Sequence, residues 1–186
     1  LGVALLVWPE WGCDPLTTFE IGLSNVFHVQ FGTVALVFEG IMFFVFLFVR
    51  KDLVHLGTLA WCFLIGPFEN LWLGILDPIL PVASEMSVGL KIVCILLGSA
   101  IIIVTLAYYI PIGLGYQTSD IFAFIAADIV KKSYGIGLII SYAILFVIGV
   151  ALGSSWGIGT LIAVVAYGPI IDRLMVIFEP FSFAVA

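Results

Sequence analysis

Residues 57–78 read GTLAWCFLIGPFENLWLGILDP, and residues 159–180 read GTLIAVVAYGPIIDRLMVIFEP. Both stretches contain Gly-Thr-Leu, then Gly-Pro, then an acidic residue followed by Pro, and these landmarks have the same spacing in the two copies. Each stretch is an apolar helix with Gly-Pro near its middle, where a proline removes a backbone hydrogen bond and clashes with the preceding turn. We therefore predict an internal duplication that supplies two broken membrane helices with polar residues just beyond each break.

The composition of the chain indicates an integral membrane protein. Of its 186 residues, 63% are hydrophobic and 10% are charged, and the mean hydropathy is +1.31. A soluble domain usually carries about 25% charged residues. There is no basic patch of the kind that binds nucleic acid. Cys13, Cys62 and Cys94 are scattered without metal-ligand spacing, so we expect no disulfide framework, metal or cofactor.

The apolar segments are long enough to predict several membrane crossings as helices, which need about 20 residues each. Four full segments cover residues 31–49, 53–76, 88–110 and 134–152, and a fifth covers residues 157–178. Residues 1–8 resemble the end of a sixth span whose start lies upstream. Two shorter amphipathic segments, residues 15–27 and 119–130, each follow a Gly-rich break.

The short segments belong to the same duplication as the Gly-Pro helices. They align at a constant offset, with Gly12 opposite Gly115 and Thr17 opposite Asp120. The predicted unit is a span, a short helix, a second span and a kinked span, which gives one repeat over residues 1–80 and another over residues 87–186 within a single membrane domain. The predicted helix breaks are Gly12, Pro15, Pro67, Gly115 and Pro169.

Basic residues predict the topology of this all-α polytopic protein. Arg50-Lys51 and Lys131-Lys132 fall on one side of the membrane if each unit crosses three times, and on opposite sides if the short helix also crosses. Basic residues collect on the cytoplasmic side, which favours three crossings. The two repeats are then inverted, as in many secondary transporters. Each repeat has three transmembrane helices plus one short re-entrant or interfacial helix, and both termini are cytoplasmic.

Ionisable residues within the spans are the candidate site, because a charge at the bilayer centre costs at least about 2.5 kcal/mol. Glu39 is either a protonated carboxyl bonded to a neighbouring helix or a proton-coupling or cation site. We expect Arg173 to pair with Glu69 or Glu39, as a structural lock between the repeats or as a gating or substrate-binding pair. Helix capping is the simpler account of Asp14 and Asp120. The candidate path residues are Glu39, Glu69, Asn70, Asp120, Asp172 and Arg173.

Two further patterns have both a structural and a functional interpretation. An aromatic cluster near the breaks fits a belt at the membrane interface, or alternatively a cage for an organic cation. It comprises Trp8, Trp11, Tyr108, Tyr109 and Tyr116. Gly149, Gly153 and Gly157 form a small-residue stripe that favours close helix packing, within the chain or in a homodimer. The sequence shows no phosphate loop, metal-ligand helix pair or catalytic triad, so we expect no enzyme activity.

Several motifs also resemble the YczE/YitT-like bacterial integral membrane proteins, most closely the YczE-type branch. They are GCDPLT at residues 12–17, GLS at 22–24, GYQTSD at 115–120 and GPIID at 168–172. Thr17 stands where that branch has Asp, and Asn70 stands where the second copy has Asp172. The resemblance implies a multi-spanning protein of the bacterial cytoplasmic membrane that is often assigned as a transporter.

The sequence as a whole favours a small secondary transporter, with ion- or proton-coupled export of a small organic solute through a polar site at the repeat interface. Its expected partners are the lipid bilayer and a small-molecule or ion substrate. The alternative is a non-transporting membrane protein that docks or assembles with a partner protein. A polar cavity would favour transport, whereas a dry core with Arg173 sealed in an ion pair would favour docking.

Overall fold

The structure is a computed structural model that describes the backbone of residues 1–182 and the side chains of residues 1–180. Its described part contains eight α-helices and one 3-10 turn, which agrees with the predicted all-α class. The elements are α1 (Gly2–Val7), α2 (Pro15–Phe27), α3 (Phe31–Val49), α4 (Leu56–Leu76), α5 (Val88–Tyr109), η1 (Ile110–Ile112), α6 (Thr118–Val130), α7 (Tyr134–Ala151) and α8 (Ile158–Ser182). The last four residues of the predicted second repeat, 183–186, lie outside the described part.

Five helices are long and apolar enough to cross a membrane. These are α3, α4, α5 continued by η1, α7 and α8. Large apolar side chains cover much of their outer surface, and Phe48 on α3 is 88% exposed. Because water does not favour such a surface, these faces contact lipid. The chain is therefore an integral membrane protein, and the spans lie where the hydropathy predicts them, except that α4 begins at Leu56 after a turn.

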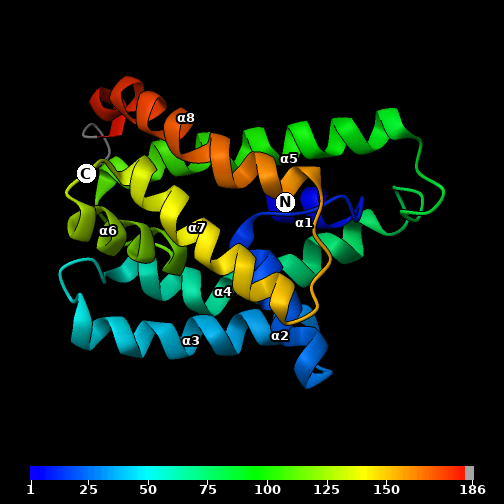
Figure 1. Cartoon of the computed structure of the whole chain (residues 1–186), viewed down its shortest axis with the longest axis horizontal. Helices are drawn as coiled ribbons and strands as arrows, with labels where there is room; N and C mark the ends of the chain where they lie inside the picture. The colour runs from blue at the N-terminus through cyan, green and yellow to red at the C-terminus, as the bar shows by residue number, and fades with distance from the viewer. Residues whose placement is uncertain (183–186) are drawn as a thin grey trace.

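Both basic clusters lie at the same end of the molecule. The loop after α3 and the loop after α6 come together at the left of Figure 1, whereas residues 77–87 lie at the opposite end. Arg50 connects the first two loops, because its Nη1 is 2.7 Å from Asp128 Oδ2 and its Nη2 is 3.0 Å from Asp52 Oδ2. Hydrogen bonds from Arg50 hold the pKa of the Asp52 carboxyl below its usual value. Lys131-Lys132 follows Asp128 directly, so the predicted same-side placement of the clusters agrees with the fold.

Cysteine labelling tests this placement in a membrane. Single cysteines at Lys51, Lys131 or Glu85, in a chain without the three native cysteines, would each be exposed to water. An impermeant maleimide should label Lys51→Cys and Lys131→Cys from the cytoplasmic side, and Glu85→Cys from the other side, because the first two share one end of the bundle. Labelling of the two lysine positions from opposite sides would contradict the arrangement.

The Gly-Pro pairs do not end their helices, and the chain continues as helix through both predicted break positions, Pro67 and Pro169. Pro67 lies inside the continuous α4 and Pro169 inside the continuous α8. The preceding glycines explain the motif: a Cβ on Gly66 would lie 3.2 Å from Leu36 N on α3, and one on Gly168 would lie 2.9 Å from the Gly135 carbonyl carbon on α7. The backbones thus pack closely in both pairs, and this packing holds the helix together across the missing hydrogen bond.

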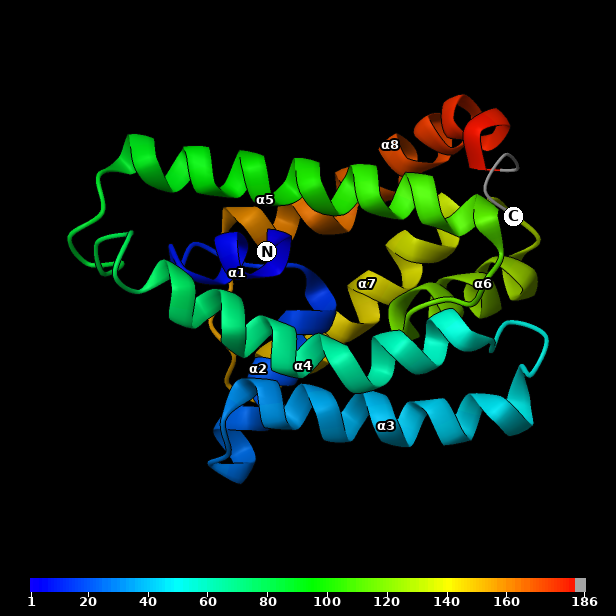
Figure 2. The same cartoon turned by 180° about the vertical axis from the view of Figure 1, so that it is seen from behind.

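The Gly-rich segments do interrupt the chain, as predicted at Gly12, Pro15 and Gly115. Gly12 has φ +99° and Gly115 has φ +112°, values that residues with a side chain rarely adopt. Pro15 is the first residue of α2, a position where its missing N–H costs nothing. Figures 1 and 2 show that α6 runs toward the end of the molecule where the loop after α3 lies, whereas α2 runs away from that end and mostly across the bundle.

Each Gly-rich break contacts the start of the distant Gly-Thr helix. Gly57 N donates to Leu114 O at 2.7 Å, and Tyr116 N donates to Thr58 Oγ1 at 2.9 Å. In the other half, Gly159 N donates to Trp11 O at 3.1 Å. The Gly-Thr-Leu landmark therefore begins a helix against which the opposite break packs, which explains why it occurs twice.

The small-residue stripe packs within the chain. A Cβ on Gly149 would lie 2.8 Å from Thr18 O on α2, and one on Gly157 would approach the Trp11 carbonyl group. Gly153 has φ +86° and ends the turn after α7. Gly149 and Gly157 thus make close intramolecular contacts, whereas a Cβ on Gly153 would meet nothing within 4 Å.

Candidate functional site

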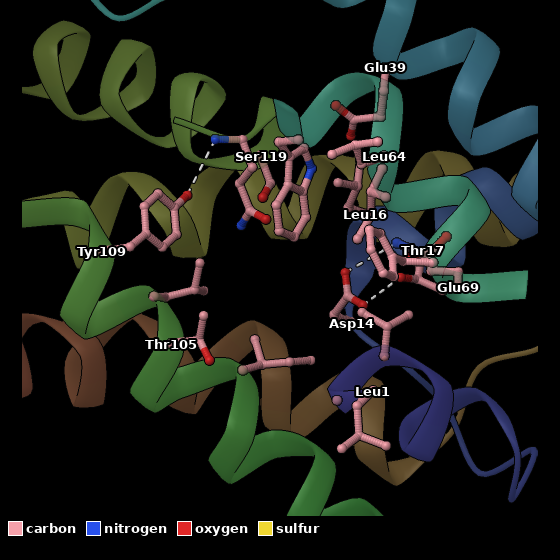
Figure 3. Close-up of a pocket in the computed structure, with 18 of the residues that line it drawn as sticks. Leu1, Asp14, Leu16, Thr17, Glu39, Leu64, Glu69, Thr105, Tyr109 and Ser119 are labelled. Atoms are coloured by element: carbon pink, nitrogen blue, oxygen red, sulfur yellow. Dashed lines mark hydrogen bonds between the residues drawn. The ribbon is translucent and has the colours of Figure 1, made fainter. Parts of the chain in front are cut away.

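A cavity of about 560 Å³ lies in the interior of the helix bundle, with lining residues from α1 to α7. Its volume is within the range of small-molecule sites, about 300 to 1,000 Å³. Figure 3 shows Asp14, Glu39 and Glu69 approaching it from separate elements. The polar and aromatic lining residues are Asp14, Thr17, Glu20, Glu39, Trp61, Glu69, Trp72, Thr105, Tyr109, Gln117, Ser119 and Tyr142.

Asp14 brings the start of α2 to the cavity. Its Oδ1 accepts a hydrogen bond from Thr17 N at 3.1 Å, and its Oδ2 accepts one from the Thr17 hydroxyl at 2.5 Å. These are the bonds of a helix N-cap, and they satisfy backbone N–H groups that a helix start leaves free. The capping interpretation of Asp14 is therefore confirmed, with the cap itself forming part of the cavity wall.

Glu39 joins three helices at the cavity. The side chain, on α3, is 1% exposed and accepts hydrogen bonds from Cys62 Sγ on α4 at 3.4 Å and from the Thr118 hydroxyl on α6. Its second oxygen, Oε1, has no hydrogen-bond partner. The bonded oxygen matches one sequence interpretation, a carboxyl bonded to neighbouring helices, and the second oxygen is buried where it can carry a proton.

Glu69 and Glu20 complete an acidic set. Glu69, on α4, is 6% exposed, and its Oε2 has no hydrogen-bond partner. Glu20, on α2, is 3% exposed and interacts electrostatically with Glu69, Glu39 and Asp14. Sequence reasoning missed Glu20, although its position three residues after Thr17 places both on one face of the short helix.

The ionisable side chains that line the cavity are all acidic. Four carboxyl groups line it, and its lining contains no Lys, Arg or His side chain. A buried carboxylate is strongly disfavoured unless it is paired with a cation, so these groups hold protons or a bound cation. Within the described residues, no group of three or more His, Cys, Asp or Glu side chains is arranged to hold a metal ion.

Asp120 is a buried carboxyl that accepts several hydrogen bonds behind the cavity wall. The N-cap of α6 is Gln117. Asp120 is 0% exposed and accepts hydrogen bonds from the hydroxyls of Tyr109 and Tyr134, the latter at 2.7 Å. Gln117 Nε2 donates a further bond at 3.1 Å. Because Tyr109 and Gln117 themselves line the cavity, Asp120 fixes the wall indirectly from the first turn of α6.

Three predicted path residues lie away from the cavity. Asp172 accepts a hydrogen bond from Gly135 N at 2.8 Å and so joins α8 to α7. Asn70 is exposed and packs against Gly32 on α3. This contact between α4 and α3 resembles the contact of Asp172 with Gly135 between α8 and α7. Arg173 is also exposed.

The expected pairing of Arg173 with Glu69 or Glu39 is not formed. Within the described part of the chain, the ion pairs are those of Arg50 with Asp52 and Asp128. The reason lies in helix geometry: adjacent residues point about 100° apart, so Asp172 facing α7 turns Arg173 outward. Among the described residues, no Lys or Arg side chain therefore pairs with the acids of the cavity.

The aromatic cluster divides between two places. Tyr109 lines the cavity together with Trp61, Trp72 and Tyr142. Trp8 Nε1 instead donates to Pro81 O at 3.0 Å, and the Trp11 ring lies 5.3 Å from Lys91 Nζ. Trp8 and Trp11 thus make their contacts at the end of the bundle where residues 77–87 lie. The aromatic side chains of the cavity wall are mostly ones that the sequence analysis did not single out.

A family model described as a family of unknown function (DUF6198) matches residues 1–176, so the chain belongs to this family. No curated protein matches the chain, and neither does any solved structure.

Proposed function

We propose that this member of the DUF6198 family is a small secondary transporter that couples proton movement to the export of a small organic solute through the acidic cavity. The observation that carries the proposal is the set of four carboxyl groups around a ligand-sized space whose lining contains no Lys, Arg or His side chain. Ionisable residues at membrane depth usually mark substrate, ion or proton paths, because their burial has a large energetic cost.

The proposed framework is a pair of inverted repeats, with α1 to α4 in one and α5 to α8 in the other. Support comes from the basic clusters at one end, the directions of α2 and α6, of which only α6 runs toward that end, and the reciprocal contacts of the Gly-rich breaks with the Gly-Thr helices. In this framework, each short helix is re-entrant, and α1 is the end of the first span. The resemblance to the YczE/YitT-like proteins fits the same picture of a bacterial cytoplasmic membrane protein with cytoplasmic termini.

The proposed mechanism uses the position of the cavity between the halves. Asp14, Glu20, Glu39 and Glu69 come from the first half, whereas Tyr109, Gln117 and Tyr142 come from the second. Rocking one half against the other would expose the same acids to each side in turn, as in transporters built from inverted repeats. Protons and solute would then alternate on the carboxyl groups.

A non-transporting docking protein is the less favoured alternative. It would be supported by a dry core with Arg173 sealed in an ion pair and by an outward-facing glycine stripe. Arg173 is exposed instead, and Gly149 packs against α2. A cavity lined by unpaired acids also serves no evident purpose in a protein that only docks a partner.

A reconstitution assay tests the proposed function. Purified protein is placed in liposomes that contain a pH-sensitive dye, and solutes are added as separate sets of amines, carboxylic acids, sugars and neutral amides. We expect at least one set to drive proton movement across protein-containing liposomes and not across protein-free liposomes. If, for every set of solutes, the internal pH changes no faster than in protein-free liposomes, the proposal is overturned.

A further inference from the structure

We propose that the solute accepted by this cavity is a small monovalent organic cation, an alkylammonium or arylalkylammonium compound, bound between the carboxyl group of Glu69 and the aromatic side chains on the same face of α4. This inference rests on the proposed function and specifies its substrate class. It is a statement about binding, so it can be tested without transport.

The first argument is electrostatic. Glu69 is 6% exposed and lines the cavity, and its Oε2 is buried without any hydrogen-bond partner. A buried carboxyl oxygen without a partner carries a desolvation cost, which an ammonium group would offset. The side chains that face it are also acidic or neutral: Asp14 and Glu20 from the α2 region, Glu39 from α3, Tyr109 from α5 and Tyr142 from α7. The amino group of Leu1 is a positive group that interacts with Glu69. An anion would be repelled by every ionised side chain in this set.

The second argument is the shape of the wall. Trp61, Glu69 and Trp72 are eight and three residues apart on α4, so helical periodicity places them on one face, and all three line the cavity. An aromatic face attracts a cation, and the attraction is stronger when water is excluded. Leu16, Leu64 and Phe68 add apolar surface. A charged head with a hydrocarbon body matches this combination.

The third argument excludes the simpler cations. Calcium requires six to eight converging oxygen ligands, and transition metals favour His and Cys ligands. No group of three or more such side chains has that arrangement among the described residues. The cavity of about 560 Å³ also exceeds what an inorganic ion would fill. An organic cation makes use of both the space and the apolar wall.

Binding would exchange a proton for the solute. When the ammonium enters, the O–H bond of one carboxylic acid breaks, the proton passes to water, and the resulting carboxylate pairs with the ammonium. One positive charge leaves as another arrives, so the net charge of the cavity is unchanged. This exchange is how a cation-binding site would couple to protons.

Isothermal titration calorimetry on the full-length chain in detergent tests the inference. The probes are tetramethylammonium, benzyltrimethylammonium and tetraethylammonium, with benzylsulfonate as an anion of similar size. We expect at least one ammonium to bind with net proton release, seen as a dependence of the heat on the ionisation enthalpy of the buffer, and benzylsulfonate not to bind. Glu69→Gln should weaken the binding about ten- to a hundredfold, because a charged partner is lost.

Glu85→Gln is the matched control, because it makes the same substitution at an exposed acid outside the cavity and should leave affinity unchanged. If Glu69→Gln does not give a monodisperse protein, Glu20→Gln serves the same purpose. Failure of all three ammonium probes, binding of benzylsulfonate, or equal affinity in the Glu69 and Glu85 variants would each overturn the inference.

The two proposals can fail separately. Ammonium binding without any proton movement in liposomes would leave the cation site in place and overturn transport. Proton movement driven by acids, sugars or amides, without ammonium binding, would leave transport in place and overturn the cation assignment.

Discussion

Replacing Gly115 with alanine is expected to destabilise the protein by about 2 to 6 kcal/mol, the sum of backbone strain and overpacking at a single site. Gly115 has φ +112°, and an added Cβ would lie 2.7 Å from Thr58 N and 2.8 Å from Thr58 Oγ1. The contact atoms are partly backbone and cannot move aside, so the break before α6 would separate from the start of α4. Thermal or denaturant unfolding in detergent, together with the yield of monodisperse protein, measures the effect.

Gly113 provides a matched control two residues away. It also has a positive φ, +72°, but an added Cβ would meet no heavy atom closer than 3.9 Å. Gly113→Ala should therefore cost only the left-handed backbone strain, about 1 to 2 kcal/mol. The other half offers the same comparison, because a Cβ on Gly12 would lie 2.5 Å from Thr160 Oγ1, whereas one on Gly153 meets nothing within 4 Å. Equal losses of stability within either pair would show that the close contact is unimportant.

The sequence was sufficient for the order and limits of the helices. Hydropathy predicts a span wherever about 20 apolar residues occur together, and such runs are unambiguous in this chain. The short helices were also accessible, because Asp14-Pro15 carries a capping residue and a first-turn proline that fix the start of α2. Both signals are local, and local signals depend little on the rest of the fold.

The sequence was insufficient where tertiary packing decides. A Gly-Pro pair indicates a break from local rules, but Gly66 and Gly168 instead allow two backbones to meet, and the helix continues. Likewise, Asp120 looks like a cap until Tyr109 and Tyr134 approach it from α5 and α7.

The direction in which a residue faces around its helix axis could also not be predicted from the sequence. Asp172 and Arg173 are neighbours in one span, so the sequence predicts the same membrane depth for both. Only the hydrogen bond between Asp172 and Gly135 shows which of the two faces inward. Glu20 was overlooked because a short amphipathic helix is normally expected to keep its acids in water. The path of the break before α2 instead brings it inside. Depth can be read from sequence, whereas the facing direction requires the neighbouring helices.

Glu39→Gln is expected to reduce solute-driven proton movement in liposomes to the rate of protein-free liposomes. The substitution keeps the size of the side chain and an oxygen that can accept the bond from Thr118, but it removes the group that gains and loses a proton. Solute binding should persist, because Glu20 and Glu69 remain. The measurement compares proton movement with exchange of labelled solute in the same liposomes, and we expect exchange to continue while coupling is lost.

Asp172→Asn tests whether the proton path runs through the cavity or through Asp172, an acid of the predicted path that lies outside the cavity. Asp172 bonds to Gly135 N outside the cavity, and an asparagine oxygen can accept that bond at 2.8 Å without a charge. The variant should therefore retain proton coupling with at most a modest loss of stability. Coupling lost in Asp172→Asn but kept in Glu39→Gln would place the proton path along α7 and α8, because only an ionisable group on the path changes the proton stoichiometry when it is neutralised.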